Sequence, residues 1–211
     1  AAGNQQQKGK NKQQQQQANQ NNQKGGKKDK GKKNKQPQQK QAPATFTVSA
    51  LDIRVGKIVK AWEHPESDKL FCEEVDLGED APRQIASGLR AFYKKEDLEN
   101  RRVVVLCNLK KRNLVGFPSH GMVLCASNAD HTAVQFMEPP ADAKVGERVT
   151  FAGFDGNPEP ENKVAKKKIF EGLAPFLKTN DEGICVWKEA VSQTSGGPIK
   201  AAKGMPGAQV S

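Results

Sequence analysis

Lysine and arginine side chains are the residues of this chain best placed to do chemistry, and that chemistry is the binding of phosphate. Between residues 57 and 120 they recur at short intervals, beside a serine and a histidine that could add hydrogen bonds. Each position alone is typical of a solvated surface charge, but together they predict one basic face that binds a nucleic-acid backbone. The positions predicted to contact phosphate are Lys57, Lys60, Lys69, Arg83, Arg90, Lys110, Lys111, Arg112, Ser119 and His120.

The first 45 residues hold the whole excess of positive charge. They contain eleven lysines and one aspartate (11 − 1 = +10), whereas the rest of the chain has 23 basic and 23 acidic residues. A segment so rich in Gln, Asn, Lys and Gly buries too little apolar surface to fold, so residues 1–45 are predicted to be a disordered basic tail. A solubilising linker is one interpretation, and nonspecific, salt-sensitive RNA binding is the other. The tail residues predicted to bind RNA are Lys27, Lys28, Lys30, Lys32, Lys33 and Lys35.

Sequence motifs of catalysis and metal binding are missing. There is no glycine-rich phosphate loop, no HExxH zinc pattern and no GxSxG nucleophile motif. The three histidines, His64, His120 and His131, are far apart and lack the spacing of metal ligands. We therefore predict no catalytic residue, no metal site and no cofactor.

Cysteines and apolar segments indicate the compartment. The four cysteines form no CxxC pair, which predicts buried free thiols in a reducing environment. No apolar stretch approaches the roughly 20 residues of a membrane span, and the N-terminus has no apolar signal-peptide core. We predict a cytoplasmic protein without a membrane anchor.

The elements that must position the cations begin with residues 50–70. Ile53 and Val55 alternate with polar neighbours, which predicts a half-buried strand. At Gly56 the alternation breaks, which predicts a bulge or a sharply coiled strand. Residues 63–68 are polar and predict a turn into a second strand. This order of elements favours a small barrel.

Further short strands are predicted at regular intervals. They lie near residues 70–76, 83–87, 103–109 and 121–126, with weaker ones near 134–137 and 148–151. One helical turn is predicted at 94–100 and a loop at 110–120. We therefore predict an all-β fold with an OB-fold Greek-key barrel over residues 46–152.

Residues 153–211 predict a mixed C-terminal extension. Helical spacing predicts a helix near 163–173, which Gly172 and Pro175 weaken at its end. A strand is predicted at 184–187, and the last segment is predicted to be loop with at most one edge strand.

Several short motifs stand in a fixed order: DIRVGKI at 52–58, HPESDKL at 64–70, SGL at 87–89, NLK at 108–110 and SHGM at 119–122. This set resembles the OB-fold tRNA-binding domain of the endothelial monocyte-activating polypeptide type. That family carries D-[IL]-R-[VI]-G-x-I, H-P-x-[AS]-D-x-L, S-G-L, N-L-K and S-x-[GA]-M. The segment LCASN, the pair Pro139-Pro140 and the lysines at 166–168 extend the resemblance over roughly residues 46–211.

The resemblance implies a non-catalytic protein or appended domain that binds the body of tRNA by shape and charge, without reading bases. It would deliver tRNA to an aminoacyl-tRNA synthetase or a multisynthetase complex. It also implies that residues 153–211 pack on the barrel and imitate a dimer interface, so that the chain acts as a monomer. The alternatives are a scaffold that docks a synthetase while only the tail touches RNA, and a released cytokine-like polypeptide.

One loop departs from the family. Its members usually read K-M-R-G or K-L-R-G before S-x-[GA]-M, whereas this chain has Asn113, Leu114, Val115 and Gly116. The cations come earlier here, at Lys111 and Arg112, and the phosphate contact of the loop would then fall to them.

Overall fold

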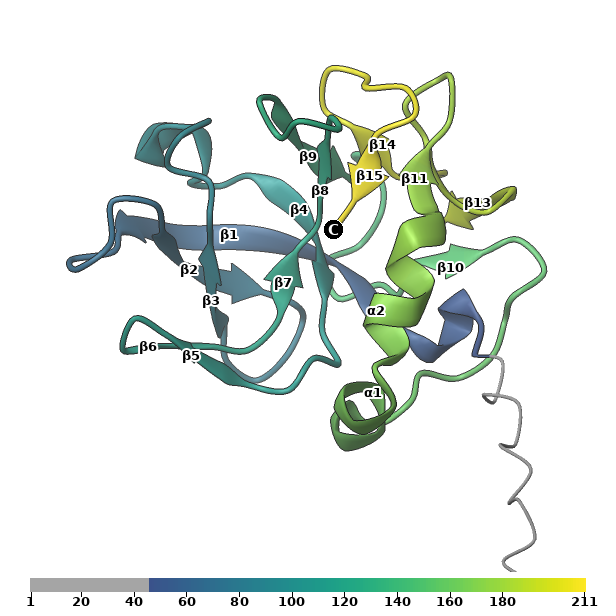
Figure 1. Cartoon of the computed structure of the whole chain (residues 1–211), viewed down its shortest axis with the longest axis horizontal. Helices are drawn as coiled ribbons and strands as arrows, with labels where there is room; N and C mark the ends of the chain where they lie inside the picture. The colour runs from purple at the N-terminus through teal and green to yellow at the C-terminus, as the bar shows by residue number, and fades with distance from the viewer. Residues whose placement is uncertain (1–45) are drawn as a thin grey trace, which may run out of the picture. The chain divides into compact units, whose positions relative to one another are not determined.

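The structure, a computed structural model, describes residues 46–211 (Figure 1). The disorder and the RNA binding predicted for residues 1–45 therefore lie outside the described residues. Within the described part of the chain, no helix is long and apolar enough to cross a membrane.

A five-stranded antiparallel sheet in the order β3-β2-β1-β4-β7 curls into a nearly closed barrel in the described chain (Figure 1). The segment before β7 lies along the free edge of β3. There the backbone N–H of Ala86 donates to the Ser119 hydroxyl at 3.0 Å, and that of His120 donates to the Gln84 carbonyl oxygen at 2.9 Å. The predicted barrel is confirmed, as are the strands predicted near 70–76 and 83–87. The bounds are β1 (Ile53–Glu63), β2 (Phe71–Asp76), β3 (Arg83–Ser87), β4 (Arg102–Leu106) and β7 (Met122–Val123).

Strand β1 is long enough to pair with β4 through its first half and with β2 through its second half. The irregularity predicted at Gly56 lies further on, because the register with β2 shifts between Ile58 and Lys60. Gly56 has a different role: a Cβ there would lie 3.0 Å from side-chain atoms of both Leu77 and Val75. The glycine lets the end of β2 approach closely, and the later shift turns the strand.

Two apolar cores meet at β4, which explains why the four residues after Arg102 are all apolar. The barrel core fills the barrel and includes Val103, Val105 and Cys107. The interface core lies between the barrel and residues 153–211, and it includes Val104 and Leu106. Successive side chains of a strand point to opposite faces, so β4 needs apolar residues at consecutive positions, from Val103 to Leu106.

Residues 110–120, predicted to be a loop, instead form a hairpin of β5 (Arg112–Leu114) and β6 (Phe117–Ser119). Its two-residue tip, Val115 and Gly116, has positive φ angles of 50° and 85°. Positive φ at both central residues defines the type I′ turn of tight hairpins. The prediction of a loop is wrong because this short strand pair bonds mainly to itself and carries polar side chains.

The strand predicted at 121–126 divides between the two sheets of the fold. Its first part is β7 of the barrel, and its second part, β8 (Cys125–Ser127), joins the second sheet. That sheet has the order β10-β13-β12-β11-β15-β8-β9-β14 and carries most of the C-terminal extension. The remaining strands are β9 (Val134–Glu138), β10 (Thr150–Phe151), β11 (Leu177–Thr179), β12 (Cys185–Trp187), β13 (Ala190–Gln193), β14 (Lys200–Ala201) and β15 (Gln209–Val210).

The C-terminal extension holds more regular structure than its sequence predicts. The strand predicted at 184–187 is confirmed as β12. Strand β11 lies where a turn was predicted, β13 lies where nothing was predicted, and β14 and β15 lie in the last segment, for which one edge strand was allowed. The short helical turns are η1 (Val48–Ala50), η2 (Lys95–Asp97) and η3 (Ala174–Phe176), and η2 confirms the turn predicted at 94–100. The predicted boundary at residue 152 stays a prediction.

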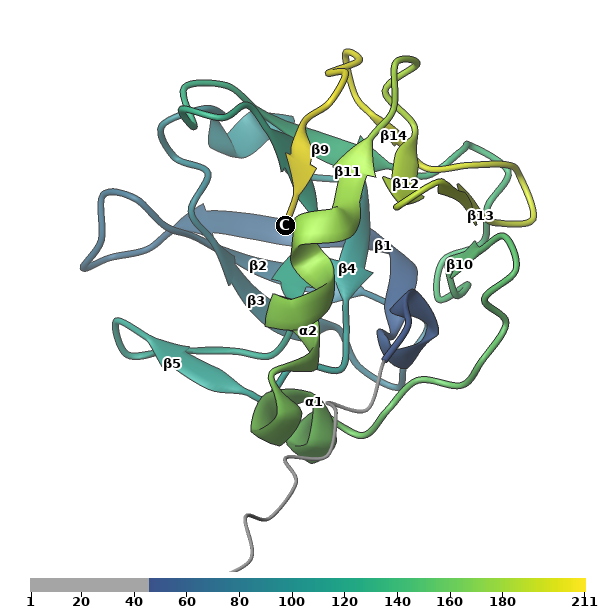
Figure 2. The same cartoon turned by 45° about the vertical axis from the view of Figure 1, so that its right-hand side comes forward.

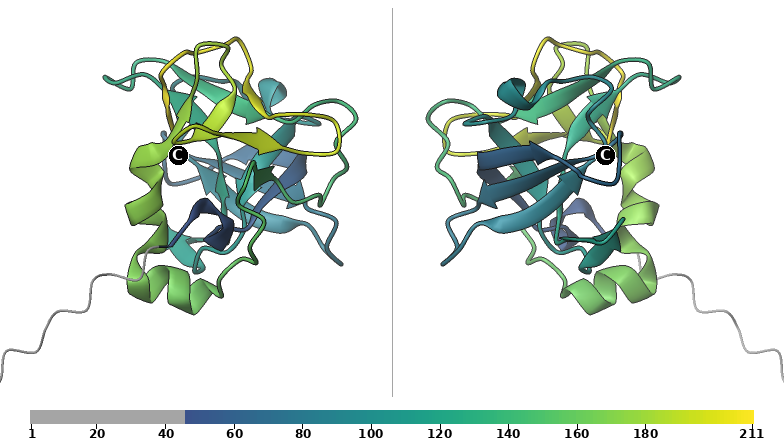
Figure 3. Two further views of the ribbon diagram at one scale, coloured as in Figure 1. Left: turned by 90° about the vertical axis from the view of Figure 1, so that its right-hand side faces the viewer. Right: turned by 90° about the vertical axis from the view of Figure 1, so that its left-hand side faces the viewer.

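The predicted helix near 163–173 is two helices, α1 (Glu161–Lys167) and α2 (Ile169–Leu173), which run along one side of the molecule (Figures 2 and 3). Lys168 separates them in a left-handed conformation with φ 51°. Val164 and Ile169 both reach the interface core, although five residues of a continuous helix would set them about 140° apart. The break brings both side chains onto the same core.

Candidate nucleic-acid interface

Four of the ten predicted phosphate contacts have their polar groups engaged within the protein. Arg83 forms a two-point ion pair with Glu79, at 2.7 and 2.6 Å, and also donates to the Cys107 carbonyl oxygen at 2.7 Å. This pairing raises the pKa of Arg83 and lowers the pKa of Glu79. The Arg83 guanidinium therefore ties β3 to the end of β4.

Arg90 and His120 act as similar ties. Arg90 donates to the Ser67 carbonyl oxygen at 2.5 Å and to Glu63 at 2.6 Å, which pins the turn between β1 and β2. His120 lies 2.6 Å from Glu161 and so joins the base of the hairpin to α1. Ser119, the fourth engaged residue, is 5% exposed and its hydroxyl helps to close the barrel.

The other six predicted contacts are cations that form no ion pair within residues 46–211. Lys60, Lys69, Lys110, Lys111 and Arg112 are exposed, and Lys57 is half-buried. The three consecutive cations lie at the start of the hairpin. Their donors are available to a ligand, and a flexible exposed cation is well suited to a phosphate.

An aromatic contact joins the hairpin to the end of β1. The rings of Trp62 and Phe117 meet edge to face at 5.8 Å, and the His64 ring lies 6.3 Å from Phe117. The Lys60 ammonium sits 5.1 Å from the centre of the Trp62 ring. Lys60 and the hairpin therefore share one face of the barrel. Lys57 lies five residues before Trp62 on the same strand, roughly 16 Å along it.

This face corresponds to the binding surface typical of OB-folds, which use the loop between the first two strands and the loop after the fourth. Here those loops are the turn after β1 and the hairpin. Their tips meet, because a Cβ on Gly116 would lie 4.0 Å from a Glu66 carboxylate oxygen.

The backbone of the hairpin tip is strained at Val115, the position where members of the endothelial monocyte-activating polypeptide family carry arginine. Val115 adopts φ 50° and is 51% exposed. A β-branched residue in the left-handed region is a real outlier, and such outliers gather at functional sites.

Several motif residues have structural roles. The buried Asn108 side chain accepts from the Asp52 N–H at 2.9 Å and donates to the carbonyl oxygens of Ala50 and Glu159, at 2.9 and 2.8 Å. The His64 ring is buried, and its Nδ1 accepts from the Glu66 N–H at 3.1 Å. These residues hold together the segments that display the cations.

Sequence reasoning missed Glu73, which is fully buried on β2. The Ser87 hydroxyl donates to one of its carboxylate oxygens, while the other oxygen has no hydrogen-bond partner among the described residues. Burial raises the pKa of Glu73 from 4.5 to about 7, against the opposing effect of Ser87. One signal was present: Glu73 has the strand parity of Phe71 and Val75, which point into the barrel core.

The cysteines, the loop aromatic residues and the possible metal ligands are described next. The four cysteines are buried free thiols, as predicted. The centre of the Tyr93 ring lies 4.6 Å from that of Phe136, and the Tyr93 hydroxyl donates to the Val134 carbonyl oxygen, so this ring packs against the protein. Phe92 is 37% exposed. Among the described residues, no cluster of three His, Cys, Asp or Glu side chains is arranged to hold a metal ion.

A barrel of this type with exposed cations on its loop face defines a nucleic-acid-binding class of domain. Comparison with known proteins gives the family. Residues 53–148 match the family described as "Putative tRNA binding domain". The crystal structure of the C-terminal domain of Plasmodium vivax p43 is 33% identical, with a TM-score of 0.71 over 78% of this chain and 99% of that one. The chain belongs to this family of tRNA-binding domains of the endothelial monocyte-activating polypeptide type.

Longer proteins contain a similar segment. The "Probable methionine–tRNA ligase" of rice, Oryza sativa subsp. japonica, is 50% identical over 76% of this chain. The aminoacyl tRNA synthase complex-interacting multifunctional protein 1 of mouse is 43% identical over 74% of it. The chain spans 20% of the rice protein and 50% of the mouse protein.

Proposed function

We propose that this chain is a non-catalytic tRNA-binding protein or appended domain, which binds the folded body of tRNA through the hairpin face. The observation that carries the proposal is the set of exposed cations on that face, above all Lys110, Lys111 and Arg112, whose donors no carboxylate of the described residues occupies. Family membership supports the same ligand.

The physical basis is the shape of RNA. An A-form helix exposes phosphates and 2′-hydroxyls but hides most of its base edges, so proteins recognise it largely by backbone geometry. Lysine and arginine contacts to phosphate position a protein without reading sequence. The hairpin and the end of β1 present such cations on one rigid surface, held by the contact between Trp62 and Phe117.

The test compares folded tRNA with linear RNA of equal length by fluorescence anisotropy. Replacing Lys110, Lys111 and Arg112 by alanine should weaken tRNA binding by at least about tenfold. The matched control replaces Lys178, Lys200 and Lys203, exposed lysines on β11, on β14 and in the turn after β14, and should change affinity less than twofold. Equal losses in both triple variants would contradict the proposal.

The tail of residues 1–45 adds nonspecific affinity in this proposal. Deleting it should flatten the plot of log affinity against log salt, while the preference for folded tRNA persists. If the tail-less chain binds tRNA and linear RNA equally, or binds neither, the barrel is not the tRNA-binding element.

Delivery of tRNA to an aminoacyl-tRNA synthetase in the cytoplasm completes the proposal, and the relatives that are synthetases or synthetase-complex proteins support it. A scaffold function predicts the opposite dependence on the hairpin. If the hairpin triple variant loses tRNA but still associates with a synthetase, the hairpin serves RNA. If it loses the synthetase and keeps tRNA, the hairpin is a protein dock.

We also propose that the chain is monomeric. The interface core joins the outer face of β4 to residues 153–211, with Val104 and Leu106 packed in the same cluster as Leu177 and Trp187. The extension thus covers an apolar face of the barrel, which would otherwise be exposed and could bind a second copy of the chain. Analytical ultracentrifugation should give the monomer mass at micromolar concentration, and a stable dimer would contradict this part.

A further inference from the structure

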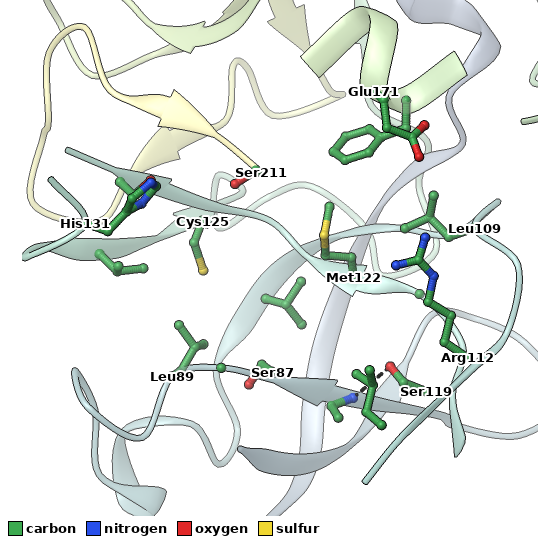
Figure 4. Close-up of a pocket in the computed structure, with 18 of the residues that line it drawn as sticks. Ser87, Leu89, Leu109, Arg112, Ser119, Met122, Cys125, His131, Glu171 and Ser211 are labelled. Carbon is green, nitrogen blue, oxygen red and sulfur yellow. Dashed lines mark hydrogen bonds between the residues drawn. The ribbon is translucent and has the colours of Figure 1, made fainter. Parts of the chain in front are cut away.

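A pocket of about 410 Å³ opens where the edge of β3 faces β7 and β8, beside the hairpin and α2 (Figure 4). Its wall is largely apolar, and its volume lies in the range of sites for small organic groups. The apolar side chains include Leu89, Leu109, Met122, Val123, Cys125 and Val134.

Buried polar atoms without partners lie at and behind this wall. Ser127 lines the pocket, is 6% exposed, and its hydroxyl oxygen has no hydrogen-bond partner in residues 46–211. Ser87 also lines the pocket and donates to Glu73, whose second carboxylate oxygen is likewise unpartnered. Both oxygens are closed to solvent, so they lie behind the wall, and the surface that the pocket offers to a ligand is mainly apolar.

The rim on the hairpin side is cationic. Lys110 and Arg112 both line the pocket, and Figure 4 shows the Arg112 guanidinium pointing into it, toward Met122. Glu171 of α2 adds one carboxylate to the lining, so the cations outnumber the acidic side chains by two to one. A site with cations at its mouth and an apolar wall matches two parts of a nucleotide, the phosphate and the ring faces.

We propose that this pocket receives one unpaired nucleotide of the bound RNA. The base enters against Leu89 and Met122, and its phosphate lies beside Lys110 and Arg112. The proposal rests on the RNA binding proposed above and adds to it, because it gives a shape-reading face one point of contact with a base. RNA with a flipped or terminal unpaired base would bind more tightly than fully paired RNA of equal charge.

The test uses the full chain and two RNA duplexes. One carries a single unpaired adenosine at a 3′ end, and the other carries an abasic nucleotide at the same place, so the phosphate charge is equal. Stacking and hydrogen bonding of one base are expected to make the adenosine duplex bind about tenfold more tightly. Equal affinities of the two duplexes would overturn the pocket proposal while leaving RNA binding by the hairpin intact. Absence of binding to both would overturn both proposals.

A pocket-filling variant locates the effect. Met122→Trp places a large side chain in the pocket and should abolish the preference for adenosine. The preference is measured as the ratio of the two affinities, so a general change in RNA binding cancels. The matched control is Met205→Trp, at a second half-buried methionine outside the pocket, which should keep the preference. If Met122→Trp is folded by circular dichroism and keeps the preference, the base binds elsewhere and the proposal fails.

Discussion

The cations of the hairpin and the cations around β3 are alike in sequence but differ in their surroundings. Arg83 and Arg90 each meet a carboxylate and a backbone carbonyl oxygen inside the fold. Lys111 and Arg112, by contrast, are exposed and form no ion pair with any described residue. The comparison teaches that a basic residue is a candidate ligand contact when its donors are free, and a structural tie when they are occupied.

Glu73 gives the largest expected effect and extends the comparison from cations to a buried acid, whose hydrogen bond comes from Ser87 and not from a cation. Burial raises its folded-state pKa to about 7 from 4.5, so the folded protein holds more protons than the unfolded chain between these values. The stability that the neutral carboxyl contributes is present below about pH 4.5 and is lost as the pH rises through 7. Glutamine at position 73 stays neutral at every pH. The free energy of unfolding of Glu73→Gln should therefore rise relative to that of wild type by about 3 kcal/mol as the pH goes from 4 to 8.

Urea unfolding of both proteins across this pH range measures the difference. Parallel stability curves would show that the buried carboxyl does not titrate as its surroundings require.

Arg83→Met should lower the free energy of unfolding by about 2 kcal/mol. It breaks the hydrogen bonds of the guanidinium to the Glu79 carboxylate and to the Cys107 carbonyl oxygen, and the two paired side chains, Arg83 and Glu79, are only partly exposed. Arg112→Met, the same substitution at an exposed residue, should change stability by less than about 0.5 kcal/mol. Thermal or denaturant unfolding compares the two variants. If both lose equal stability, the division into tied and free cations is wrong.

Val115 gives the smallest expected effect. Its variants test whether charge at the hairpin tip adds to the binding by the free cations. Val115→Asn should raise stability by about 1 kcal/mol, because asparagine tolerates the left-handed conformation better than valine. Val115→Arg adds the cation that the resembling family carries there. It should steepen the salt dependence of tRNA binding by about 0.8 in the log–log slope. If Val115→Asn has the same effect on binding, relief of strain and not charge is responsible.

The sequence predicted the barrel because its strands carry strong local patterns. Ile53 and Val55 alternate with polar neighbours at the start of β1, and the apolar run at 103–107 marks a strand that is buried on both faces. The hairpin could not be predicted in the same way, because β5 and β6 have three residues each and pair with one another. Lys168 is unremarkable as a helix residue, and only packing of both helices on one core reveals the break.

The ten predicted contacts show the same limit. Their residue types were informative, but their partners depend on register and closure. Arg90 meets Glu63 across 27 residues, and His120 meets Glu161 across 41. No local sequence pattern encodes such pairs. The sequence therefore identified the basic residues, but it could not show which of them are paired within the protein and which are free to bind a ligand.

The most direct test measures the tRNA dissociation constant against potassium chloride concentration for wild type, Arg112→Met and Arg83→Met. The account predicts weaker binding and a slope reduced by about 0.7 to 0.9 for Arg112→Met, since one phosphate contact is lost. It predicts an unchanged slope for Arg83→Met at a temperature where that variant is folded. A reduced slope for Arg83→Met together with an unchanged slope for Arg112→Met would contradict it.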